Sequence, residues 1–144
     1  MTVILVPVTT FSDALFWTLY CTNPEIIAPR RLLAYLPYWA QHSLHTVSMV
    51  TVVMDIVLTP RRRPDNMKKG KTILIGFGAL YSLVVHICKL NGEYVYAILE
   101  TASLTHELTM YLCFILTLSL IYRAQWYLID FVWGQKSEKS LKIK

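Results

Sequence analysis

Charged side chains are scarce in this sequence. Of its 144 residues only 16% are Asp, Glu, Lys or Arg, whereas 55% are hydrophobic, and the mean hydropathy is +0.44. A soluble domain of this length usually carries about 25% charged residues to cover its surface. The shortfall predicts that much of the surface faces lipid. The length itself is enough for one domain of ordinary size.

Glycine, proline and cysteine are also few, and each shortage removes a class of protein. Five glycines and six prolines are too few for a collagen-like or disordered chain, and nothing repeats at the period of a solenoid. The three cysteines lack C-x-x-C spacing, so neither a zinc site nor a disulfide framework is indicated. No glycine-rich phosphate loop and no G-x-S-x-G motif occurs. The N-terminal run also lacks the basic start and cleavage site of a signal peptide.

What the chain does have is apolar segments that approach membrane-spanning length. About 20 residues are needed, because a helix rises ~1.5 Å per residue through a hydrocarbon core of ~30 Å. Helices are expected, since lipid offers the backbone no hydrogen-bond partners and so few segments cannot close a barrel. The sequence therefore predicts an all-α, polytopic transmembrane bundle over residues 1–134 and a basic tail at 135–144. The four predicted spans are residues 3–20, 38–58, 72–88 and 108–129.

Most of the net charge of +5 lies outside these spans. The loop TPRRRPDNMKKGK at 59–71 holds six Lys or Arg, and the tail holds four lysines. Threading the predicted spans puts this loop and both termini on one side, which the positive-inside bias places in the cytosol. Contact with anionic lipid head groups is an alternative use of the same charges. A nucleic-acid interface is excluded, because the soluble basic face that it needs is missing. We expect an endomembrane or the plasma membrane.

Two histidines occur three residues apart in the second predicted span, within LPYWAQHSLHT at 36–46. His42 and His45 project from one face of a helix, because residues three apart are neighbours on its surface. A polar group in hydrocarbon is costly unless it is satisfied, so this face should point into the bundle. The same stripe continues through Met49, Val52 and Ile56.

Two acidic residues bear on this histidine pair. Asp55 lies ten residues beyond His45, about 15 Å along the helix axis, so it cannot orient that ring directly. Its expected partner is Arg61 or Arg62 of the basic loop. Asp13 lies in the middle of the first predicted span, where a charge is unusual. Its candidate partners are His42, His45 and Arg123.

Three interpretations of the histidines remain open on the residues alone. They pack and hydrogen-bond to neighbouring helices, or they bind a metal together with His86 or His106. In the third interpretation a neutral imidazole accepts the proton of a nucleophilic hydroxyl. Two further groups of polar residues have expected roles that are structural rather than catalytic. His86, Glu100, His106 and Glu107 mark a membrane–water boundary, and Arg123 pairs with Asp130 at the cytosolic surface.

A family resemblance favours the third interpretation. The string from Pro37 to Thr46, the acidic Asp55, LTPRRRP at 58–64 and GEYVY at 92–96 resemble the androgen-induced protein family. PVTTF at 7–11, FW at 16–17, Pro29 and WG at 133–134 resemble it too. The resemblance covers about residues 4–134. It implies multi-pass membrane hydrolases that cleave fatty acid esters of hydroxy fatty acids, with a threonine nucleophile and a histidine base.

Within that family the catalytic histidine matches His45. His42 matches its neighbour, to which we assign a supporting role together with Gln41 and Asp55. The sequence departs from the family at two of these positions. Gln41 stands where Asn is typical, and Asp55 replaces Glu. Gln41 keeps the amide and extends its reach by one methylene.

The nucleophilic threonine of the family lies on a span that precedes the segment beginning at Val3. By motif no residue of this sequence takes that role: Thr9 and Thr10 match another part of the family, and Thr46 projects about 100° from His45 on a helix. The sequence is therefore expected to be a fragment or short isoform, or a complete chain without the nucleophile.

Two functions follow from these expectations. The first is hydrolysis of fatty acid esters of hydroxy fatty acids by the full-length relative, with His45 as base and no metal or organic cofactor. The second is a non-catalytic membrane protein that binds lipid or pairs with another membrane protein. Apolar slots between aromatic side chains would hold the lipid in either case; they involve Phe16, Trp17, Trp39, Tyr81 and Tyr111.

Overall fold

The computed structural model describes residues 2–23, 25, 35 and 37–134, and its secondary structure within those residues is entirely helical. The long helices are α1 (Thr2–Thr22), α5 (Met67–Leu90) and α7 (Leu104–Ile129), and a π-helical turn, η2 (Asp130–Gly134), extends α7. The short helices are α3 (Tyr38–His45), α4 (Val47–Leu58) and α6 (Ile98–Thr101). The prediction of an all-α protein is confirmed. The predicted tail at 135–144 and Pro29 lie outside the described residues.

Among the described helices, three are long and apolar enough to cross a membrane: Val3–Thr22, Met67–Leu90 and Leu104–Gly134. They coincide with three of the predicted spans and support a membrane protein. The predicted span at 38–58 differs, because it forms two consecutive helices, α3 of 8 residues and α4 of 12, that meet at Thr46. The break lies inside the polar stretch from Gln41 to Ser48, where the predicted catalytic residues are found.

Local signals determine where the long helices begin and end. The side chain of Asn66 accepts hydrogen bonds from two backbone N–H groups of the first turn of α5, at 3.0 and 3.3 Å. This cap lets α5 begin at Met67, earlier than the apolar run at residue 72 indicates. At the other end Gly92 has φ +80°, a left-handed conformation that favours glycine just past a helix. Ser103 caps α7 by accepting from the backbone N–H of His106 at 3.4 Å.

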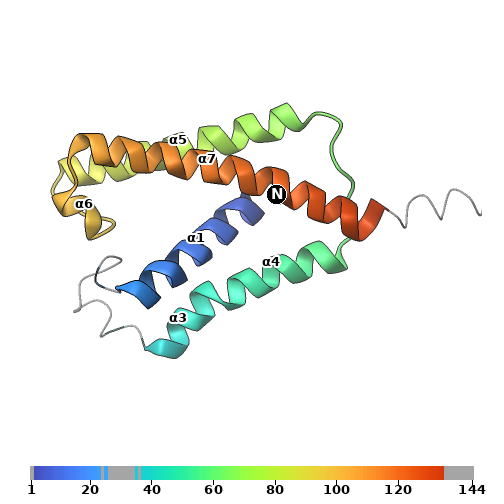
Figure 1. Cartoon of the computed structure of the whole chain (residues 1–144), viewed down its shortest axis with the longest axis horizontal. Coiled ribbons are helices and arrows are strands. Elements are labelled where there is room, and N and C mark those ends of the chain that lie inside the picture. Colours follow the sequence, from blue (N-terminus) through green and yellow to red (C-terminus); the bar gives the residue numbers. More distant parts are fainter. Residues whose placement is uncertain (1, 24, 26–34, 36, 135–144) are drawn as a thin grey trace, which may run out of the picture.

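The helix α1 lies at the centre of the arrangement. Figure 1 shows α5 and α7 side by side, with α1 lying between that pair and the α3–α4 segment; α1 packs against α7, α4, α5 and α3. The buried core is built where α1, α4, α5 and α7 meet, and it lies toward the N-terminal end of α1. Its members are Val6, Val52, Ile56, Leu74, Leu118, Tyr122, Trp126 and Ile129.

Close contact between α5 and α7 depends on a missing side chain. A Cβ on Gly70 would overlap the hydroxyl of Tyr122, which is 1% exposed. The same hydroxyl donates to the carbonyl of Met67 at 3.4 Å, so the phenol has little room to move. Glycine at this position makes room for the phenol of Tyr122 between the two helices.

Candidate functional site

His45 lies at the C-terminal end of α3, where it faces α1. Its Nδ1 is 3.1 Å from Oδ1 of Asp13, and its ring stacks on Phe16 with centroids 3.7 Å apart and planes 11° apart. The side chain is 23% exposed. Among the described residues, Nε2 has no hydrogen-bond partner. The imidazole is therefore held by one edge and one face, while its second nitrogen stays available.

Asp13 lies in the middle of α1 and is 4% exposed. Of the three partners that the sequence offered, it binds His45. Its second oxygen, Oδ2, accepts a hydrogen bond from the hydroxyl of Ser48 in α4. Within the described ranges no lysine or arginine pairs with Asp13. Among the described residues, the imidazole of His45 is thus the one group beside this carboxylate that can carry a positive charge.

His42 occupies a separate position on the same helix. Its Nδ1 lies 2.9 Å from the hydroxyl oxygen of Thr46, one turn later. Its ring lies 4.6 Å from the ring of Trp17 and contacts Tyr38 edge-on at 4.5 Å, measured between ring centroids. Its neighbours are aromatic rings and a hydroxyl rather than the carboxylate. This environment fits a supporting role, and that role stays a prediction.

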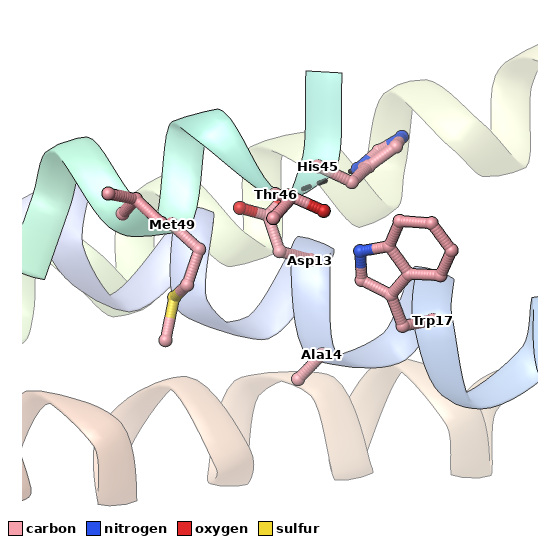
Figure 2. A pocket seen from close by; sticks show the side chains of 7 residues that line it. Asp13, Ala14, Trp17, His45, Thr46 and Met49 are labelled. Carbon is pink, nitrogen blue, oxygen red and sulfur yellow. Dashed lines mark hydrogen bonds and ion pairs between the residues drawn. The ribbon is translucent and has the colours of Figure 1, made fainter. Parts of the chain in front are cut away.

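An open groove of about 220 Å³ lies between α1 and the α3–α4 segment. Figure 2 shows Asp13 reaching from α1 toward His45 and Thr46, with Trp17 and Met49 on either side. Enclosed sites for drug-sized ligands start near ~300 Å³, so the groove suits an ester group and a short part of an acyl chain. Its lining is mainly apolar around one polar cluster: Asp13, Ala14, Trp17, His45, Thr46, Met49 and Val50.

The other predicted supporting residues, Gln41 and Asp55, do not line the groove. Gln41 is 4% exposed on α3. Asp55 does not meet His45; it pairs with Arg61 at 2.7 Å and accepts a hydrogen bond from Thr59. The expected pairing of Asp55 with the basic loop is therefore confirmed. Charge near Asp55 is already balanced by that arginine.

A second histidine–carboxylate pair joins α5 to α7. Glu107 is 1% exposed and lies 2.7 Å from Nδ1 of His86 and 2.9 Å from the ammonium of Lys89, while the hydroxyl of Tyr111 also donates to it. Lys89 donates in addition to the carbonyl of Ala102 at 2.8 Å. Only part of the predicted cluster forms. Glu100 is exposed, and His106 bonds to Ser103 at 2.9 Å.

Two further sequence expectations are corrected by the structure. The predicted pair of Arg123 with Asp130 is wrong, because Asp130 pairs with Arg63 at 3.4 Å and Arg123 is exposed. Of the aromatic residues expected to form lipid slots, only Phe16 and Trp17 lie at the site. Tyr81 shares a hydrogen bond of 2.7 Å with Tyr96, and burial together with this bond raises the pKa of the Tyr96 phenol above its usual range.

Metal binding has no support within the described residues, where no three His, Cys, Asp or Glu side chains come close enough to hold an ion. Sequence reasoning missed Ser48 as part of the site. The signal was its spacing, since Ser48 follows His45 by three residues on a nearly continuous helix. Which residue it would meet on α1 was not readable from that spacing.

Comparison with known proteins adds the family context. A family model described as FAR-17a/AIG1-like protein matches residues 1–128. The human androgen-dependent TFPI-regulating protein is 28% identical over 149 residues, which cover 99% of this chain and 62% of that protein. The golden hamster (Mesocricetus auratus) form is 28% identical over 96% of this chain and 60% of its own length. The human androgen-induced gene 1 protein is 25% identical over 100% and 61%.

The chain thus spans about three fifths of the length of these curated relatives. No solved structure matches it.

Proposed function

Because the chain belongs to the FAR-17a/AIG1-like protein family, we propose that it is the part of a membrane hydrolase that carries the catalytic base. The substrates would be fatty acid esters of hydroxy fatty acids. One observation carries the proposal: the imidazole of His45 borders an apolar groove between membrane helices, with Nδ1 held by Asp13 and Nε2 unengaged among the described residues.

In the proposed reaction Nε2 of His45 accepts the proton of an attacking hydroxyl while its oxygen bonds to the ester carbonyl carbon. The resemblance implies that this hydroxyl belongs to a threonine on a span before Val3. The imidazolium then returns the proton to the departing oxygen of the hydroxy fatty acid as the ester bond breaks. Water then attacks the acyl-threonine ester, with Nε2 of His45 accepting its proton. The imidazolium returns that proton to the threonine oxygen as the second fatty acid leaves.

The groove favours a lipid ester over a polar substrate. Ala14, Trp17, Met49 and Val50 supply apolar walls, and the acyl chains would extend from the groove into the surrounding hydrocarbon. Keeping such chains out of water contributes about 0.8 kcal/mol per CH₂. His42, held between Trp17 and Tyr38, would keep this wall in place.

Topology is part of the same proposal. The arginines and lysines at 59–71 favour the cytosolic side for that loop and for both termini. The helix α4 (Val47–Leu58) separates His45 from this loop, so the groove would open in the opposite half of the bilayer. Cysteine labelling at Thr59 and at Asn91 in sealed vesicles tests this orientation.

The function is tested with protein expressed from the longest reading frame of its gene and reconstituted in lipid nanodiscs. We expect hydrolysis of a fatty acid ester of a hydroxy fatty acid, and His45→Gln should lower kcat by on the order of 10²–10⁴-fold. His86→Gln is the control, since His86 also bonds a buried carboxylate but does not line the groove. Equal activity of His45→Gln and the wild type would remove His45 from the mechanism.

A non-catalytic lipid-binding protein is the second candidate. The observation that favours it is that the hydroxyl of Thr46, which lines the groove, is engaged by His42. A fluorophosphonate activity probe separates the two functions, because it labels only a competent nucleophile. Binding of the ester with neither labelling nor turnover would support the second.

A further inference from the structure

Burial of the ionisable side chain of Asp13 within a membrane helix is unfavourable in free energy. Asp13 is 4% exposed, in the middle of a helix long and apolar enough to span a membrane. Ionisable side chains in such positions are rare and usually functional. A buried carboxylate that serves stability alone is normally matched by a cation. No Lys or Arg matches it in the described part of the chain.

Both oxygens of Asp13 are nevertheless engaged, each by a different residue. Oδ1 is 3.1 Å from Nδ1 of His45, and Oδ2 accepts from the hydroxyl of Ser48. Ser48 also lies 2.7 Å from the carbonyl of Leu44, but it has one proton, and donation to a charged acceptor is the stronger bond. Two contacts on different oxygens fix the rotation of the carboxylate.

This geometry determines which nitrogen of His45 carries the proton. An ionised carboxylate only accepts hydrogen bonds, so Nδ1 must be the N–H donor. The lone pair of the neutral ring is then on Nε2, the nitrogen without a partner among the described residues. Phe16, stacked on the ring at 3.7 Å, restricts rotation of the ring out of this plane, and the bond to Asp13 selects the direction of the lone pair within it.

We propose that Asp13 is a positioning residue of the hydrolase: it holds His45 as the Nδ1–H tautomer and stabilises the imidazolium, and Ser48 holds Asp13. The inference rests on the proposed function. The proton of the attacking hydroxyl goes to Nε2 and leaves with the alcohol oxygen, while Asp13 stays ionised throughout. Because both of its oxygens are engaged by His45 and Ser48, Asp13 acts on the reaction through His45.

Kinetics test the charge of Asp13. Asp13→Asn keeps the shape and removes the charge, and we expect kcat to fall at least about tenfold, toward the ~10⁴-fold loss of an orienting aspartate in serine proteases. KM should stay within about twofold, because asparagine has the size of the aspartate that it replaces in the groove wall. Asp130→Asn, at the Arg63 pair, should match the wild type.

The role of Ser48 is tested in the same assay. Ser48→Ala should lower kcat by a smaller factor than Asp13→Asn. Ser43→Ala is the control, since the hydroxyl of Ser43 donates to a backbone carbonyl.

A spectroscopic test needs no turnover and uses the 144-residue chain itself. With ¹⁵N-labelled histidine in nanodiscs, the His45 signal, identified by its loss in His45→Gln, should show a protonated Nδ1 and a bare Nε2 at neutral pH. In Asp13→Asn and Asp13→Leu a mixture of tautomers should appear. A wild-type ring protonated on Nε2, or a tautomer unchanged in both variants, would overturn the inference.

The two proposals fail in different ways. Turnover that depends on His45 but is unaffected by Asp13→Asn overturns the positioning role and leaves the hydrolase. A wild type without turnover, or one that needs no His45, overturns the hydrolase and with it any role of Asp13 in catalysis. Loss of kcat together with the tautomer change supports both.

Discussion

In two places this bundle sets a buried carboxylate against Nδ1 of a histidine, and the surroundings of the two carboxylates differ. Glu107 also receives the ammonium of Lys89 and the hydroxyl of Tyr111, so its charge is balanced before His86 is considered. Asp13 receives the hydroxyl of Ser48 and, among the described residues, no lysine or arginine, so its charge is left for His45. The first pair fastens α5 to α7, and the second borders a groove.

The difference separates a structural pair from a candidate catalytic one. A carboxylate already paired with lysine gains little from a second cation beside it. A carboxylate with no other cation stabilises imidazolium, because opposite charges attract strongly in low dielectric. Burial alone does not make the distinction, since side-chain exposures are 1% for Glu107 and 6% for Asp13.

The largest effect on stability is expected at the balanced pair. Glu107→Leu leaves the ammonium of Lys89 without its partner, and breaking a buried pair in this way costs about 3–5 kcal/mol in free energy of unfolding. Thermal unfolding in detergent should show the loss, and Glu107→Leu with Lys89→Met should regain most of it. If Glu107→Leu alone were as stable as the wild type, the Lys89 ammonium would be solvated by water in the variant. The Glu107 pair would then not stabilise the contact between α5 and α7.

Adding a cation beside Asp13 should give the Asp13–His45 pair the charge balance that Lys89 gives the Glu107–His86 pair. Met49 lines the same groove, and Met49→Lys would bring an ammonium toward the carboxylate. The new charge would compete for Asp13 and oppose the imidazolium, so we expect kcat to fall about tenfold, equivalent to ~1.4 kcal/mol. Met49→Leu controls for shape. If lysine and leucine variants were equally active, charge balance would not be what distinguishes the two pairs.

The smallest effect is expected at Thr46. Its hydroxyl bonds to His42 rather than to the Asp13–His45 pair, so Thr46→Val should change kcat by at most about fivefold, or ~1 kcal/mol. Thr51→Val, at a hydroxyl bonded to a backbone carbonyl, is the control. Loss of fluorophosphonate labelling in Thr46→Val alone would instead identify Thr46 as the nucleophile.

Much of this arrangement was predictable from the sequence. Apolar length gave the helices, and the three-residue spacing of His42 and His45 gave a shared face that continues into buried Val52 and Ile56. These predictions depend only on the geometry within one helix. The break at Thr46 was not predicted, because residues 38–58 have the length of one span and contain no proline or glycine to mark the end of a helix.

Contacts between helices were harder to predict. Asp13 had three candidate partners, and only the packing of α1 against α3 and α4 selects His45 and adds Ser48. Arg123 and Asp130 are close in sequence, but Arg63 reaches Asp130 from the basic loop, and its guanidinium also lies 5.6 Å from the ring centroid of Tyr127. Distances across the bundle depend on how whole helices are placed, which local spacing does not record.

The glycine at position 70 also has a consequence for the membrane around the protein. A slip of one turn, ~5.4 Å, between α5 and α7 would bring Leu74 to the phenol that only a bare backbone can face. The two helices therefore keep a constant register, and their combined apolar height cannot stretch or shorten. A bilayer that is thicker or thinner than this height must adjust through its own lipids or through tilt of the whole pair.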